Sequence, residues 1–88
     1  MKIDIQKFGG ILTSRPAGKE AYLVIKAYFV PPNPKELLEL DFSGVKVATP
    51  SWLDEVLTGL KKDYGDRVVV LPSDNTTLIE SLKYSGPI

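Results

Sequence analysis

The sequence predicts a single α/β domain over residues 1–88, in which a mixed, partly parallel sheet of about four strands packs against about three helices. Two observations predict this fold class. Segments with strand-like alternation are separated by segments with helical periodicity, and the helical segments are long enough to connect parallel strands. A chain of 88 residues, 43% of them apolar, can bury one hydrophobic core and has no room for a second domain.

The N-terminal segment predicts two short strands. Ile3 and Ile5 alternate with polar residues over Lys2–Lys7, which is typical of a strand with one buried face. Phe8–Gly10 predicts a turn into a second strand at Ile11–Thr13. We therefore expect these two strands to pair as a hairpin.

A helix is expected to follow, with Ser14 as its N-cap. Its apolar face would consist of Ala17, Ala21, Val24, Ile25 and Tyr28. Three prolines, at positions 31, 32 and 34, should end this helix and lead into the next strand.

The segment from residue 38 to residue 71 predicts a strand, a helix and a second strand. The first strand covers Leu38–Phe42 and resumes at Val45–Val47 after a break at Gly44. Thr49 is expected to accept a backbone N–H bond as N-cap, and Pro50 suits the first helical position. The helix stripe is expected to contain Leu53, Val56, Leu57, Leu60 and Tyr64.

The continuously apolar segment Val68–Leu71 predicts an interior strand that is covered on both faces. We expect it to lie parallel to Leu38–Phe42, because a helix joins the two. Pro72–Asn75 predicts a turn and cap, and the last helix would turn Leu78, Ile79, Leu82 and Tyr84 inward before Gly86 and Pro87 end it.

The composition argues against several classes of function. Eleven basic and eleven acidic residues give a net charge of zero, so the charge of a typical nucleic-acid binder is missing. Cysteine and histidine are absent, which removes thiolate nucleophiles, Cys- or His-based zinc sites and Ser-His-Asp triads. We expect no catalytic residues, no cofactor and no metal site. The sequence contains no membrane-spanning apolar run and no secretory signal, so a cytoplasmic location is expected.

Residues 41–57, DFSGVKVATPSWLDEVL, resemble the STAS domain found in anti-sigma factor antagonists and in sulphate-transporter tails. Asp41–Val45 matches the family's strand, which runs into an Asp-Ser-Ser/Thr-Gly loop at a helix start. Together with the segment SRPAGKE, the chain looks closest to a STAS-like bacterial family of unassigned function. In that family a Ser-Arg pair opens the first helix and the loop usually reads Thr-Pro-Ser-Phe.

The resemblance implies that the family's phosphorylatable serine falls on Ser51. Thr49 then occupies the acidic position, Pro50 the first serine position and Trp52 the glycine position. Loss of the acid removes a charge beside the serine, and an indole in place of glycine would hinder the approach of a kinase. A helix start nevertheless suits an added phosphate, because its N–H groups are unpaired. In the plainer interpretation Ser51 only opens the helix.

The expected partner-binding surface lies between Thr49 and Thr58 and comprises Thr49, Pro50, Ser51, Trp52, Asp54, Glu55 and Thr58. Two roles stay open for Trp52, which is either an exposed interface anchor or a side chain folded over the core edge towards Phe42. Arg15 and Arg67 are either solvated or able to bind an anion, and solvation is favoured. Asp41 is expected to shape its loop as a hydrogen-bond acceptor.

The expected function is protein binding in a partner-switching pathway. The resemblance implies a partner of the histidine-kinase-like ATPase class, either an anti-sigma factor or a serine kinase. A phosphate on Ser51 would add about two negative charges and reject that partner. Two alternatives stay open: a constitutive assembly domain, and a domain that binds a small anionic ligand such as a nucleotide at the helix starts.

Overall fold

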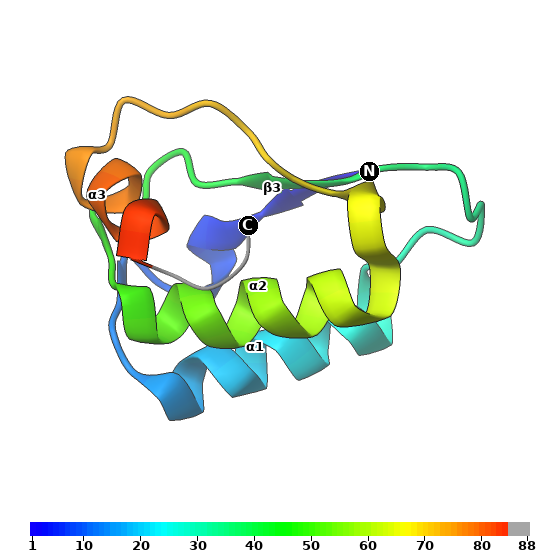
Figure 1. The fold of residues 1–88 in the computed structure, drawn as a ribbon, viewed down its shortest axis with the longest axis horizontal. Helices are drawn as coiled ribbons and strands as arrows, with labels where there is room; N and C mark the ends of the chain where they lie inside the picture. Colours follow the sequence, from blue (N-terminus) through cyan, green and yellow to red (C-terminus); the bar gives the residue numbers. More distant parts are fainter. Residues whose placement is uncertain (85–88) are drawn as a thin grey trace.

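The computed structural model describes residues 1–84. In chain order, its elements are β1 (Lys2–Asp4), the 3-10 helix η1 (Ile5–Phe8), β2 (Ile11–Leu12), α1 (Arg15–Tyr28), β3 (Leu38–Asp41), β4 (Val47–Ala48), α2 (Pro50–Tyr64), the 3-10 helix η2 (Gly65–Arg67), β5 (Val68–Val70) and α3 (Thr76–Tyr84). Figure 1 shows α1 and α2 side by side beneath the strands, with α3 at the end where α2 begins. The predicted α/β architecture with three helices is confirmed.

The strands form two small sheets, and within residues 1–84 every strand pair is parallel. One sheet has the order β1-β3-β5, and the other consists of β2 and β4. The predicted parallel pairing across α2 is confirmed, since Leu38 lies opposite Val68 and Leu40 opposite Val70. The antiparallel component of the expected mixed sheet is not found among the described residues.

The predicted N-terminal hairpin is wrong. β1 ends at Asp4, whose carboxylate accepts the Gln6 N–H at 3.1 Å and starts η1. β1 and β2 then pair separately, with β3 and β4. The backbone N–H and C=O groups of these short strands therefore form their hydrogen bonds with strands far along the chain. In this arrangement Ile3 and Ile5 are buried in the core.

The first and second parts of the chain repeat one pattern of strand, break, short strand and helix. β1, η1, β2 and α1 form the first copy, and β3, a turn, β4 and α2 form the second. The turn contains Gly44, whose φ of +85° lies in the left-handed region that favours glycine. Because the two copies are parallel, α1 and α2 begin at the same end of the molecule (Figure 1).

Helix α1 begins as predicted, with the Ser14 hydroxyl accepting the Ala17 N–H at 3.2 Å. Its buried residues are Gly18, Ala21 and Ile25. The apolar face predicted from the sequence is wrong at both ends, since Ala17 is exposed and Tyr28 is 79% exposed. The buried stripe begins at Gly18, where α2 approaches, and not at Ala17.

Helix α2 supplies the centre of the core. Its predicted stripe is confirmed, because Leu53, Val56, Leu57 and Leu60 are buried and Tyr64 is half-buried against them. They meet the inner face of the three-stranded sheet, formed by the buried residues Ile3, Leu38, Leu40 and Val68. The opposite face carries the exposed Lys2 and the half-buried Glu39, so the helices cover one side of this sheet.

Two expectations for the C-terminal part need correction. β5 is an edge strand and not an interior one, and its residues Val69 and Val70 are half-buried. In α3, Leu78 is buried as expected, whereas Ile79 points outward with 43% exposure. The side chain of Tyr84 and the expected helix end at Gly86 and Pro87 lie outside the described residues.

Helices α1 and α2 approach each other closely at Gly18. A Cβ at this position would lie 2.7 Å from the Trp52 carbonyl oxygen and 3.1 Å from the Cβ of Glu55. The two helices therefore pack at a distance that excludes any side chain at Gly18, and the backbone of α2 cannot yield as a flexible side chain would.

A polar cluster joins the same helices near their C-terminal ends. The Tyr22 hydroxyl donates to the Asp63 carboxylate, and the Lys26 Nζ lies 3.3 Å from the same carboxylate. The hydrogen bond from Tyr22, supported by Lys26, lowers the pKa of Asp63 below its ordinary 3.8. The same hydrogen bond raises the pKa of Tyr22, and Asp63 raises the pKa of Lys26.

We predict that Leu57→Ala lowers the free energy of unfolding by about 2–5 kcal/mol, because it leaves a cavity in a small core. Lys62→Ala on the exposed side of the same helix is the control and should change it by less than about 0.5 kcal/mol. Urea unfolding monitored by circular dichroism measures both values. Equal midpoints for the two variants would show that the buried face of α2 is misplaced.

Gly18→Ala should destabilise the domain although alanine favours helices, because the new methyl group meets the backbone of α2. We expect a loss of about 1–3 kcal/mol from overpacking, reduced by the helix preference of alanine. Gly10→Ala is the matched control, since its Cβ would meet nothing within 4 Å. A more stable G18A variant would contradict the close approach of the helices.

The Asp63 cluster predicts a pH-dependent difference between the wild type and Asp63→Asn. Because the pKa of Asp63 is lower in the folded than in the unfolded chain, its carboxylate stabilises the fold fully above the unfolded pKa of 3.8. This stabilisation is lost as the pH falls through the pKa of the folded state. The melting temperature of D63N should therefore be lower at about pH 7 and converge with the wild type towards about pH 3. Asp66→Asn is the control. A difference that persists unchanged in acid would exclude this role for Asp63.

Candidate functional site

The site predicted from the sequence forms where α1 and α2 begin together. β2 and β4 align Leu12 with Ala48, and the Thr49 N–H donates to the Leu12 carbonyl at 2.9 Å. The Thr49 hydroxyl donates to the Thr13 carbonyl at 2.9 Å. The expectation that Thr49 caps α2 through its side chain is wrong, because this hydroxyl ties the two helix starts together instead.

Ser51 lies in the first turn of α2 and is half-buried. Its hydroxyl makes no hydrogen bond to any group within residues 1–84. The first N–H groups of α2 lack partners in the helix, so the start of α2 carries partial positive charge. Ser51 is thus a partly exposed hydroxyl in a position that electrostatically favours an anion.

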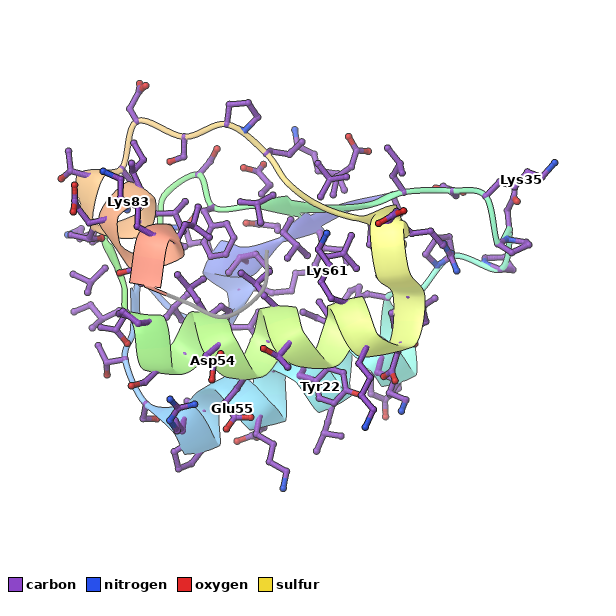
Figure 2. All side chains as sticks on the ribbon, in the orientation of Figure 1. Tyr22, Lys35, Asp54, Glu55, Lys61 and Lys83 are labelled. Atoms are coloured by element: carbon purple, nitrogen blue, oxygen red, sulfur yellow. The ribbon has the colours of Figure 1, made fainter. Side chains whose placement is uncertain are left out.

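Two acidic residues of α2 form ion pairs with Arg15, the first residue of α1. The Arg15 guanidinium donates to the Asp54 carboxylate at 2.8 Å and lies 3.7 Å from Glu55. The hydrogen bond to Asp54 raises the pKa of Arg15. Thr58 adds a hydrogen bond to Asp54 at 3.3 Å. Figure 2 shows Asp54 and Glu55 on the side of α2 that faces the start of α1.

Arg15 lies on the surface as expected, whereas the half-buried Arg67 is used within the fold. Arg15 is ion-paired at the site, as described. Arg67 donates to the carbonyl oxygens of Glu36 at 3.0 Å and Asn33 at 3.1 Å, and thereby fixes the loop before β3. Both guanidinium groups therefore have partners among the described residues.

Trp52 belongs to the core. Its side chain is 1% exposed and packs edge-to-face on Phe42, with ring centroids 6.2 Å apart and planes at 83°. Of its two open roles, the structure therefore selects the fold over Phe42, and the exposed-anchor interpretation is wrong.

The other predicted residues share one exposed ridge, which we call the α2 ridge and define as Thr49, Pro50, Ser51, Asp54, Glu55 and Thr58. Thr58 is exposed and the rest are half-buried. The ridge joins hydroxyl groups and carboxylates on a rigid helix, with Arg15 of α1 at its side. It offers hydrogen-bonding and charged groups suited to a protein surface.

The structure also shows a hollow that sequence reasoning missed, at the carboxyl ends of β3 and β5. It has a volume of about 500 Å³ and is lined by Phe42, Ser43, Gly44, Val45, Pro72, Ser73, Asp74 and Asn75. The predicted turn at Pro72–Asn75 was the available signal, but only the parallel pairing of β3 and β5 brings it to the β3–β4 turn.

Two side chains shape this hollow. The Asn75 amide donates to the Val45 carbonyl at 2.5 Å, and its oxygen accepts the Thr77 N–H at 2.9 Å at the start of α3. Asp41 accepts the Ser43 N–H at 3.0 Å, as predicted, and hydrogen bonds from Ser43 lower the pKa of Asp41. Both side chains are therefore used in holding the loops.

A second, smaller hollow of about 270 Å³ lies between α2, β5 and α3. It is lined by Leu57, Lys61, Val68, Val70 and Leu82. Within residues 1–84, no three acidic side chains gather as metal ligands. No helix in this described part of the chain is long and apolar enough to span a membrane.

Comparison with protein families places most of the chain in a known family. Residues 28–85 match the model of the STAS-like domain of unknown function (DUF4325). The match covers β3, α2, β5 and α3, and it begins after the Ser14-Arg15 pair. Searches of curated proteins and of solved structures found no match. Since the family model covers well over half of the chain, this protein belongs to the STAS-like domain family of unknown function.

Proposed function

We propose that this domain is a regulatory protein-binding module, with no catalytic activity of its own, that acts through the α2 ridge in a cytoplasmic partner-switching pathway. The observation that carries this proposal is the position of Ser51, a partly exposed hydroxyl in the first turn of α2 without a partner within residues 1–84. Membership in the STAS-like family supports the choice of this surface. The rest of the ridge would supply the contacts that distinguish partners.

Phosphorylation of Ser51 would be tolerated by the fold. The free N–H groups of the first turn of α2 stabilise an anion there. The pairing of β2 with β4 also places the start of α1, including Arg15, beside the start of α2. Because the serine is not part of the buried core, the modification would change the surface rather than unfold the domain.

The electrostatic effect on a partner would nevertheless be large. Asp54 and Glu55 lie three and four residues after Ser51, on the same side of the helix. A phosphate with about two negative charges would add to these carboxylates and compete with them for Arg15. The ridge would then reject a partner that accepts the unmodified surface.

The resemblance to anti-sigma factor antagonists suggests the class of partner. We propose a histidine-kinase-like ATPase, either an anti-sigma factor that the unmodified ridge captures or a serine kinase that modifies it. A small anionic ligand such as a nucleotide is less favoured at this site, because it would lie beside Asp54 and Glu55 without the covalent bond that would hold a phosphate on Ser51. The alternative is that the domain binds its partner permanently, as an assembly module without a switch, and the experiment below distinguishes the two.

The test is Ser51→Asp, which adds negative charge where the helix start tolerates it. We expect the melting temperature to change by no more than a few degrees and the affinity for the natural partner to fall about tenfold or more, which equals about 1.4 kcal/mol. The partner is first recovered by pull-down from the source cell and identified by mass spectrometry. Titration calorimetry with the purified partner then gives the affinities.

Asn33→Asp is the charge-matched control. It adds one negative charge on the loop between α1 and β3, at the opposite end of the molecule from the ridge, and keeps the oxygen that accepts the Lys35 N–H (Figure 2). Trp52→Ala is unsuitable as a binding probe because it truncates the core. If S51D binds the partner as tightly as N33D and the wild type, the module does not switch through this residue.

A further inference from the structure

The two edges of the three-stranded sheet differ in chemistry. The β1 edge carries the charged residues Lys2 and Asp4, which discourage pairing with another strand. The β5 edge carries Val68, Val69 and Val70 in succession and no charged residue. An apolar edge without such protection is a ready template for an added strand.

The backbone of β5 is available for that pairing. The Leu71 N–H donates to the Leu40 carbonyl at 3.0 Å, so the backbone groups of Leu71 face β3. Because these groups alternate sides along a strand, the N–H and C=O of Val70 and the C=O of Val68 face away from β3. No strand within residues 1–84 pairs with that side.

The smaller hollow lies beside the same edge. Leu57 and Val68 form its buried floor, and the half-buried Val70 and Leu82 form its walls. Lys61 completes the lining, and Figure 2 shows it between α2 and the strands. Its ammonium group forms no ion pair within residues 1–84. The groove, as we call this hollow, is therefore apolar with one unpaired positive charge.

We propose that the β5 edge and the groove bind an extended segment of another protein, which adds to the sheet beside β5. Its backbone pairs with Val68 and Val70, its alternate apolar side chains enter the groove, and a carboxylate pairs with Lys61. Strand addition of this kind takes affinity from backbone hydrogen bonds and specificity from side-chain pockets. The proposal does not depend on the α2 ridge.

Charge complementarity favours such a segment over a second copy of this chain. In a symmetric dimer, β5 would have to fill the partner's groove, yet β5 and Leu71 carry no acid to meet Lys61. The groove would then hold a desolvated and unpaired ammonium group, which is costly. An acidic strand from another protein removes this cost.

The test uses a random-peptide phage library selected on the full chain. We expect enriched peptides in which apolar residues alternate and at least one acid is present, and we expect their synthetic forms to bind the wild type. Lys61→Glu should weaken this binding about tenfold or more, and replacing the peptide's acid by lysine should restore it. Lys62→Glu, an exposed change one residue along α2, is the control and should bind normally.

Hydrogen exchange provides a readout of the pairing itself. Peptide binding should slow exchange of the Val70 amide, whereas the Val69 amide already faces β3 and should change little. Ser51→Asp should leave peptide binding intact, which separates this proposal from that for the ridge. The proposal is overturned if no peptide is enriched, if K61E and K62E bind equally, if Val70 exchange is unaffected, or if a concentration-dependent dimer buries this edge.

Discussion

The structure depends on the close, parallel contact of α1 and α2 at Gly18. With no side chain there, α1 lies directly against the Trp52 carbonyl, and Trp52 itself turns inward onto Phe42. The same contact brings Arg15 to Asp54 at one end of the helix pair and Tyr22 to Asp63 towards the other. Buried apolar packing supplies the stability, and these surface polar contacts fix the alignment.

This alignment explains the candidate site. Ser51, Asp54 and Glu55 would be ordinary surface residues on an isolated helix. The neighbouring start of α1 adds Arg15, and the hydrogen bond from Thr49 to Thr13 fixes the two starts together. A charge added at Ser51 would therefore lie beside a group of charges whose positions the two helices already fix.

Helix α2 thereby separates two surfaces of different chemistry. Its ridge is polar and acidic and lies beside α1, whereas the groove beside β5 is apolar with one lysine. The two proposals therefore concern separate surfaces of the same helix. The hollow at the carboxyl ends of β3 and β5 is held by Asn75 and Asp41, whose polar groups are used within the loops.

The sequence by itself determined the features that depend on neighbouring residues: the helix starts at Ser14 and Pro50, the buried stripe of α2, the β3–α2–β5 unit and the place of Ser51. Tertiary structure decided the rest. A hairpin for β1 and β2 satisfies local patterns, but the two strands pair instead with β3 and β4, and Ile3 and Leu12 lie in the core. Contacts between distant segments also decide the burial of Trp52, the partners of Arg15 and the free edge of β5. Periodicity and residue spacing do not encode the geometry of such contacts.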